Sequence, residues 1–286
     1  MPVPPDPRDL GPDPRCPGQT FSRDAIVVAL SKFYSSLPHI DPSRVRHAPP
    51  GGWPSITAES LARIFSLEGC STRVVDLLRH LPYIDHEEGW PWITPETMPL
   101  DYRRGPLPQD LASEPPEQQL YWRRQRSLVQ LRQVGAFDPF PPWVVQLTTS
   151  PHRDGDCWML DTSDGTLTKF VITGAGEDDP AARYDDTDPR AWRNAGEDKT
   201  YKLEALLAKW AGKYRRMEYL GVPGHQSIRG VVWRDAEFGR PGEYPWDEAQ
   251  MLKRIYQEHG WPDQYKRDEC RRAVLSWMEE AHIQLY

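Results

Sequence analysis

Apolar side chains recur at helical spacing near the N-terminus of the chain. Ser22 is suited to an N-cap, and Ile26, Leu30 and Phe33 follow it three or four positions apart. Pro38 disfavours helical geometry in the residue before it, so the pattern predicts a helix that ends there. The same spacing predicts further helices at 57–69, 72–81, 203–217, 246–258 and 263–277.

Two of these predicted helices come with specific expectations. The helix at 72–81 is expected to be capped by Thr72 and to turn Val75, Leu78 and Leu81 inward. The last helix follows the phrase HGWPD, where Gly260 suits a left-handed helix end and Asp263 suits the next cap. Trp261 is expected to anchor this corner, with Cys270 facing inward as a small apolar residue. The C-terminal region is therefore predicted to be a structural corner.

The middle of the chain changes to the residue types of strands. The run PWVVQLTTS at 142–150 is apolar and β-branched. Residues 157–173 form two similar runs on either side of Ser163, Asp164 and Gly165, and Asp-Gly supplies the positive φ that a tight turn needs. This pattern predicts an antiparallel hairpin. A further short strand is predicted at 228–233.

The order of these elements predicts an α+β fold, with a small antiparallel sheet packed by helices and joined by long Pro- and Trp-rich loops. We expect a disordered tail over 1–20, which is rich in Pro and Asp and nearly free of bulky apolar residues. Residues 21–286 are expected to form a single domain. It would carry an insertion-like excursion at 105–140 and an acidic surface loop at 174–200.

Composition narrows the classes of partner. The net charge of −7 argues against a nucleic acid, which usually requires a basic face. No apolar run approaches the roughly 18 residues of a membrane span, so no membrane contact is expected. The four cysteines form no CxxC pair, so we expect free thiols and no metal or other cofactor. With no signal-peptide pattern at the start, a cytoplasmic or nuclear location follows.

The segment HRDGD at 152–156 is the strongest candidate for polar chemistry. His152, Asp154 and Asp156 could line a ligand or metal site with Trp158 beside them, because alternating oxygen ligands are typical of cation loops. The His-Arg-Asp order also occurs in kinase catalytic loops, but Met159 stands where those loops place a magnesium-binding Asn. The simpler interpretation is a polar loop between two strands.

Two further groups have both a structural and a functional interpretation. Trp90 and Trp92 in GWPWITP could stack a sugar or a partner's proline, or they could anchor a Pro-rich loop to the core. Asp161 and Asp164 could form an acid–base pair, but a turn stabilised by their side chains is the better account. No residue is assigned a catalytic role from the sequence.

Two portions of the chain resemble known families. The unit WVVQLTTS, CWMLDTSDGTLTKF and YKLEALLAKWAGKY resembles the second half of a SUKH domain, a superfamily that includes fungal cell-wall-assembly and killer-toxin-resistance regulators and bacterial toxin-immunity proteins. The residues that match its turn and its closing helix are Leu160, Asp161, Asp164, Gly165, Leu206, Leu207 and Trp210. The phrases VVDLLRHLPYI and HGWP are similar to those of an uncharacterised fungal protein family.

These resemblances imply a binding scaffold and no catalytic residue. We therefore expect a non-enzymatic protein-interaction module, whose contact surface is the open face of the sheet together with the GWPWITP loop. The alternative is a small-molecule enzyme or binder with a dispersed site, such as an accessory protein of fungal secondary metabolism. The residues expected to bind in one or the other case are Trp90, Trp92, His152, Asp154, Asp156 and Trp158.

Overall fold

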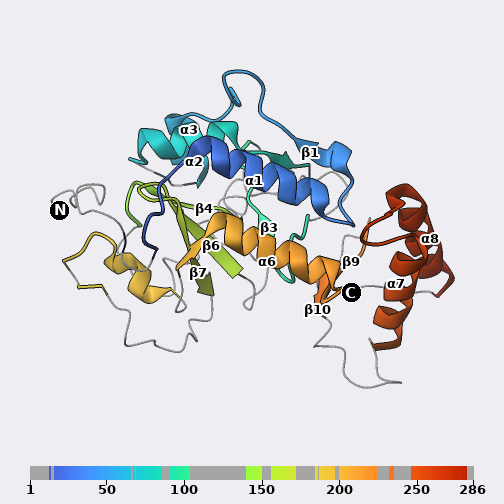
Figure 1. The fold of residues 1–286 in the computed structure, drawn as a ribbon. Coiled ribbons are helices and arrows are strands. Elements are labelled where there is room, and N and C mark those ends of the chain that lie inside the picture. Colours follow the sequence, from blue (N-terminus) through green and yellow to red (C-terminus); the bar gives the residue numbers. More distant parts are fainter. Residues whose placement is uncertain are drawn as a thin grey trace, which may run out of the picture.

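The structure is a computed structural model, and it describes residues 13, 16–65, 67, 69–85, 91–103, 140–149, 156–171, 184–185, 187–196, 200–223, 232–234 and 246–281. Helices and small antiparallel sheets alternate through these ranges, so the predicted α+β class is confirmed (Figure 1). None of the helices in the described ranges has both the length and the apolar character needed to cross a bilayer.

The largest sheet has four antiparallel strands in the order β4 (Val144–Gln146), β6 (Asp156–Asp161), β7 (Thr166–Val171) and β8 (Thr200–Lys202). Strands β6 and β7 are the predicted hairpin, in register from Asp161 opposite Thr166. Gly165 closes the turn with a φ of 80°, which explains why glycine follows aspartate there.

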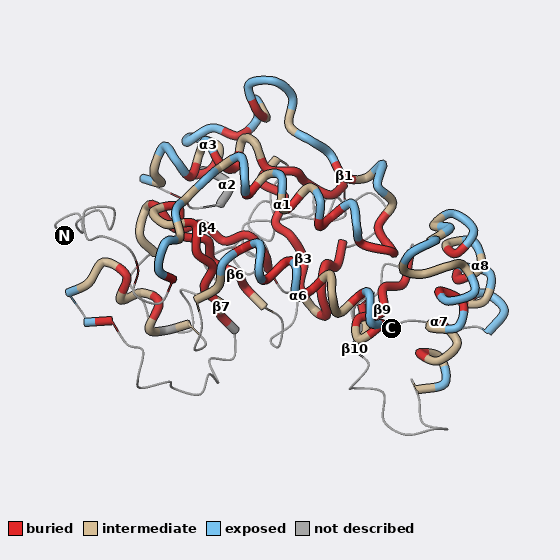
Figure 2. The backbone as a smooth tube through the Cα atoms, viewed as in Figure 1, coloured by how far each residue is buried: buried red, intermediate tan, exposed pale blue. Residues whose placement is uncertain are grey.

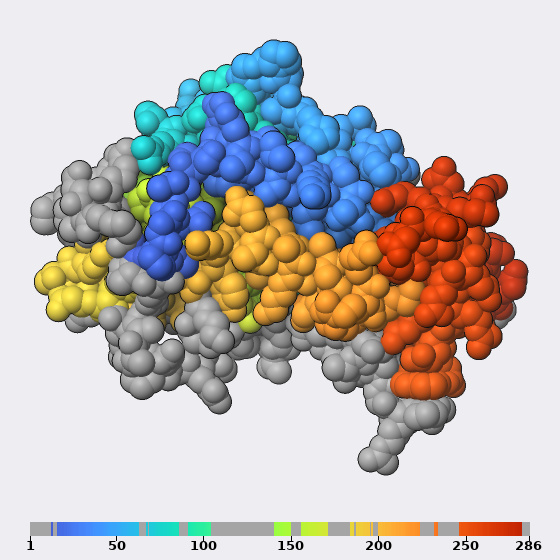
Figure 3. All heavy atoms as spheres, in the orientation of Figure 1, coloured from blue at the N-terminus to red at the C-terminus, as the bar shows by residue number. Residues whose placement is uncertain are grey.

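Helices α1 (Arg23–Ser36) and α6 (Leu203–Arg215) lie side by side over one face of this sheet (Figures 1 and 3). Both helices follow the predicted periodicity, and Ser22 caps α1 as expected. The Trp210 ring of α6 joins the layers, with its centroid 5.7 Å from those of Phe33 in α1 and Trp158 in β6. This aromatic junction is the centre of the core.

Most residues of β6 and β7 are buried whichever face of the sheet they occupy, and these strands are largely red in Figure 2. Met159 is 0% exposed and Phe170 is 3% exposed, and the Phe170 ring stacks on Trp192 with centroids 6.1 Å apart. Trp192 belongs to the 3-10 helix η5 (Ala191–Ala195), which lies within the predicted acidic loop. The prediction of an open sheet face is therefore wrong, because Trp192 of η5 and Phe140 pack against the apolar side chain of Phe170 on that face.

Helices α2 (Ala58–Phe65) and α3 (Thr72–His80) pack above the sheet (Figure 1). The cap of α3 is Ser71, whose hydroxyl accepts from the Val74 amide, where the sequence suggested Thr72. Leu78 and Leu81 are buried as predicted, whereas Val75 is half-buried and Val74 and Leu77 take the buried positions.

Short elements complete the described fold. They form three two-stranded antiparallel sheets: β1 (Val45–Arg46) with β2 (Tyr83–Ile84), β3 (Met98–Pro99) with β5 (Thr148–Thr149), and β9 (Tyr219–Gly221) with β10 (Val232–Arg234). A 3-10 turn, η2 (Pro42–Arg44), precedes β1. The predicted excursion at 105–140 lies outside the described residues, apart from Phe140.

Helices α7 (Trp246–Glu258) and α8 (Arg267–Glu280) form an antiparallel pair at one end of the molecule (Figure 1). Trp261 anchors the corner between them by donating from its indole to the Tyr214 carbonyl at 3.1 Å. Asp263 does not cap α8 as predicted; it pairs with Arg215 at the surface, and α8 begins at Arg267.

Arg267 links α8 to the C-terminal end of α1. Its guanidinium donates to the carbonyls of Ser35 and Leu37, where the end of α1 leaves carbonyls without helical partners, and to the Ile40 carbonyl beyond the helix. A cation at this position also suits the negative end of the helix dipole. The C-terminal pair is thus held to the first helix by a contact that the sequence pattern does not indicate.

The N-terminal tail was predicted too long. Asp13 is 2% exposed and Cys16 is 5% exposed, so both pack into the structure although they lie within 1–20. A polar contact rather than apolar burial orders this part, which is why the composition of the segment did not reveal it. Residues 1–12 lie outside the described residues.

Candidate functional site

The residues predicted to bind do not gather into one site within the described structure. Trp90, His152 and Asp154 lie outside the described residues. Asp156 begins β6, and its Oδ1 lies 3.2 Å from the Nζ of Lys169. An ammonium beside a carboxylate already supplies the positive charge that a metal ion would bring, so this contact disfavours the metal interpretation for Asp156.

Trp92 and Trp158 belong to the core. Trp92 is 0% exposed, and Trp158 packs edge-on against Tyr201 and Trp210 at centroid distances of 5.3 and 5.7 Å. A buried indole has no free face on which a sugar or a proline could stack. Both residues therefore anchor the core. For Trp92 this agrees with the interpretation that it fixes the Pro-rich loop to the core.

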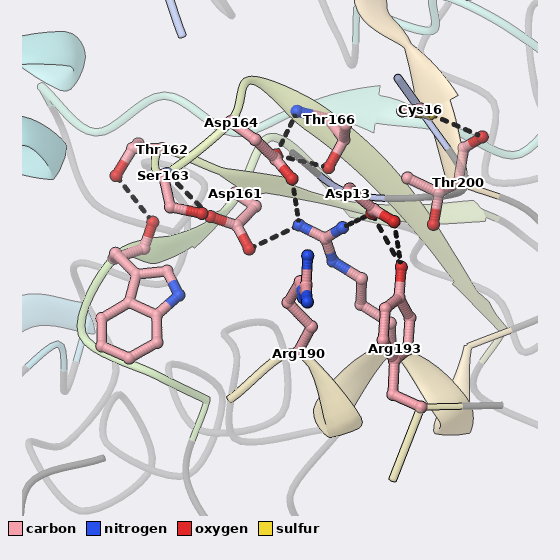
Figure 4. A network of polar contacts seen from close by, with 12 residues as sticks. Asp13, Cys16, Asp161, Thr162, Ser163, Asp164, Thr166, Arg190, Arg193 and Thr200 are labelled. Atoms are coloured by element: carbon pink, nitrogen blue, oxygen red, sulfur yellow. Dashed lines mark hydrogen bonds and ion pairs between the residues drawn. The ribbon is translucent and has the colours of Figure 1, made fainter. Parts of the chain in front are cut away.

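The structure instead brings together a buried polar network around the β6–β7 turn (Figure 4). Turn chemistry positions its two carboxylates: Asp161 Oδ1 accepts from the Ser163 amide at 2.7 Å, and Asp164 Oδ1 accepts from the Thr166 amide at 2.9 Å. Each aspartate uses one oxygen for the turn. The other oxygen of each is left to point toward Arg193.

Arg193 is the centre of this network, and its side chain is completely buried. It comes from η5, and its Nη2 donates to Asp161 Oδ2 at 2.6 Å and to Asp164 Oδ2 at 2.9 Å. Its Nη1 donates to Asp13, which also accepts from the Tyr184 hydroxyl at 2.7 Å. One guanidinium thus joins three parts of the chain: the N-terminal segment, the β6–β7 turn and the η5 helix.

The network carries more negative than positive charge. Three carboxylates contact the one Arg193 guanidinium, and the charge of Asp13 also acts on the nearby Arg190. Burial raises the pKa of Asp161, and the nearby Arg193 does not fully offset this. Burial alone would lower the pKa of Arg193, but Asp161 and Asp164 outweigh it and keep the guanidinium charged. Arg193 is therefore the group that makes burial of the carboxylates tolerable.

A second buried titratable group, His39, lies where α1, α6 and β9 meet. Its Nε2 is 2.8 Å from the Trp92 carbonyl, which can only accept, so this nitrogen carries the proton. Its ring stacks on Tyr214 with centroids 5.7 Å apart, and Nδ1 has no hydrogen-bond partner. Burial, together with the charges of Arg267 and Arg44, lowers the pKa of His39 to about 4.

His39 should make folding sensitive to acid. The unfolded chain binds the proton near pH 6.5 and the folded chain near pH 4, so stability is complete above 6.5 and falls as the pH drops toward 4. The loss attributable to His39 should reach about 2 kcal/mol at pH 5 and roughly 3 kcal/mol at pH 4. Urea unfolding across this range should give a steeper pH dependence for the natural chain than for His39→Gln. Equal slopes would contradict the buried neutral imidazole.

The four cysteines are all free. Burial raises the pKa of the Cys16, Cys70 and Cys270 thiols, in the last case to about 11. The nucleophilic form of cysteine is the thiolate, so these thiols are poor nucleophiles near neutral pH. Among the described residues, no group of three or more His, Cys, Asp or Glu side chains is arranged to hold a metal ion.

Sequence reasoning singled out Asp161 and Asp164 but missed their partners, Asp13 and Arg193. The sequence signal for these partners was weak: arginines interrupt an otherwise acidic segment at positions 190 and 193.

Comparison with protein-family models, with curated proteins and with solved structures gives no match. The resemblance to SUKH domains and to the fungal family therefore stays a prediction.

Proposed function

We propose that this chain is a non-enzymatic protein-interaction module. The observation that carries the proposal is the closed network at Arg193: both terminal nitrogens of the guanidinium are engaged by Asp13, Asp161 and Asp164. Acids and bases that act on a substrate need a face open to it. Here the buried charges around Arg193 hold three chain segments together.

The other reactive side chains of the described residues support the same proposal. The thiols of Cys16, Cys70 and Cys270 stay protonated near neutral pH, and the His39 imidazole is buried and neutral. Free thiols persist in reducing compartments, which supports a cytoplasmic or nuclear location as part of the proposal. Because both faces of the main sheet are buried, the partner is expected to bind elsewhere than on a sheet face.

Affinity capture of the full-length chain from its source cells tests the proposal. The expected result is one protein recovered in equimolar amount, quantified by mass spectrometry, and absent from a capture with the tag alone. Native mass spectrometry of the same preparation distinguishes the protein-interaction module from the alternative, a small-molecule enzyme or binder. A small molecule or metal bound in equimolar amount, with proteins only in trace amounts, would replace the proposal with the enzyme or small-molecule binder.

A further inference from the structure

The segment that leads into α1 forms a strap across one edge of the main sheet. This N-terminal strap, Asp13 and residues 16–22, begins at the Arg193 network, where Figure 4 shows Asp13, Cys16 and Thr200 close together. The Cys16 thiol donates to the Thr200 carbonyl of β8 at 3.7 Å. The strap then passes Gly165, where a Cβ would meet the Phe21 Cα at 3.2 Å, and Ser22 caps α1.

Only two points of the strap are buried. Asp13 and Cys16 lie inside, whereas Pro17, Gly18 and Thr20 are exposed. Phe21 is half-buried, with the guanidinium of Arg73 5.7 Å from its ring centroid. The strap therefore buries little apolar surface, and its attachment depends mainly on the contacts of the Asp13 carboxylate. Segments attached in this way open at a lower free-energy cost than the core does.

The charges at the attachment point make Asp13 the least necessary member of its network. When Asp13 leaves, Arg193 keeps Asp161 at 2.6 Å and Asp164 at 2.9 Å, so the guanidinium remains paired. Arg193 cannot leave the network in the same way, because its loss would remove the cation that all three carboxylates contact.

The surface beneath the strap has features that an extended acidic segment requires. The Arg193 Nη1 and the Tyr184 hydroxyl both donate to the Asp13 carboxylate, so they form a receptor for a carboxylate. Strand β8 lies at the edge of the sheet, and its Thr200 carbonyl already accepts a bond from the strap. Sheet edges commonly bind extended peptides.

We propose that the strap is displaceable, and that the site it leaves binds an extended acidic segment of the partner. The partner's carboxylate takes the place of Asp13 against Arg193 and Tyr184, and its backbone follows the β8 edge. This inference rests on the proposed interaction function and assigns that function a contact surface. The strap occupies the surface in the absence of the partner and so acts as an internal competitor.

Alkylation of the full-length protein by iodoacetamide tests displaceability, because Cys16 reports on the strap while the buried Cys157 and Cys270 report on global unfolding. In the natural chain, peptide mapping should show Cys16 reacting about tenfold or more faster than Cys157 and Cys270. In Asp13→Asn the rate of Cys16 should rise about tenfold again, which corresponds to an Asp13 contact worth about 1.4 kcal/mol. Asp263→Asn, which removes an exposed carboxylate, should change nothing. Equal rates for all three thiols would overturn the proposal.

Rates must be compared at equal thiolate fraction, taken from their pH profiles, because the Asp13 charge itself adds to the raised pKa of Cys16. With that correction, faster reaction of Cys16 in Asp13→Asn measures opening of the strap.

A synthetic peptide tests the site itself on the natural chain. The peptide spans residues 11–21 with serine in place of its cysteine, and it is added at millimolar concentration because the tethered strap has an effective concentration of about that order. It should accelerate alkylation of Cys16, whereas the same peptide with asparagine in place of its aspartate should not. Failure of both peptides would overturn the binding site. Because no cellular partner is used, this failure is distinct from failure of the capture experiment.

Discussion

Replacing Arg193 by methionine is expected to lower the free energy of unfolding by about 4 kcal/mol at pH 7. The side chain is completely buried, and methionine fills similar space without the charge. Asp161 and Asp164 would then lose the cation that they contact, and the cost comes from these carboxylates rather than from lost packing. Urea unfolding monitored by tryptophan fluorescence measures the change.

The pH dependence of the Arg193→Met variant identifies the cause. Without the guanidinium, burial raises the folded-state pKa of Asp161 further above its unfolded value of about 4. The folded variant then binds more protons than the unfolded chain, so its stability falls as the pH rises and recovers as the pH is lowered from 7 toward 5. Arg215→Met is the control for the loss of an arginine ion pair, because Arg215 pairs with Asp263 at the surface and its replacement should cost about 1 kcal/mol or less. Equal losses in the two variants would contradict the central role of Arg193.

Gly221→Ala is expected to lower the free energy of unfolding by about 3 kcal/mol, because it overpacks the core beside His39. A Cβ at this position would lie 2.0 Å from His39 Nδ1 and 2.3 Å from its Cγ. The ring cannot withdraw easily, since it is stacked on Tyr214 and donates to the Trp92 carbonyl. Glycine is required here by the close approach of the imidazole. Thermal and urea unfolding both measure the loss.

A double-mutant cycle separates this clash from other effects of the substitution. His39→Ala removes the ring, so adding Gly221→Ala to it should cost much less than in the natural chain. The Tyr256 hydroxyl donates to the Gly221 carbonyl at 2.7 Å, and no member of the cycle removes either of these groups. If the alanine were equally destabilising with and without the imidazole, the explanation by close approach would fail.

Local patterns predicted most of the regular elements. Ile26, Leu30 and Phe33 repeat at helical spacing and lie on the buried face of α1, as the stripe from Leu203 does in α6. The hairpin was predictable because Asp164 and Gly165 satisfy a conformational requirement of the turn itself. In each case the decisive interactions lie within a few residues of one another.

The candidate site could not be predicted in the same way. Asp13 and Arg193 are 180 positions apart, and both lie in segments whose composition indicates exposure. Asp161 and Asp164 satisfy a turn equally well with or without a buried arginine, so their positions carry no trace of Arg193. The segment around Trp92 is rich in proline, which is common in surface loops. Only the packing of the folded chain decides that the Trp92 indole is buried.

The sequence by itself determined the α+β class, the main helices and the β6–β7 hairpin, because helix periodicity and turn chemistry are local properties of the chain. Only the tertiary structure decided that Arg193 is buried, that both faces of strands β6 and β7 are covered, and that Asp13 and the hairpin turn meet at the same guanidinium. Those outcomes depend on which distant charges meet away from water. Burial strengthens such pairing, and nothing local encodes it.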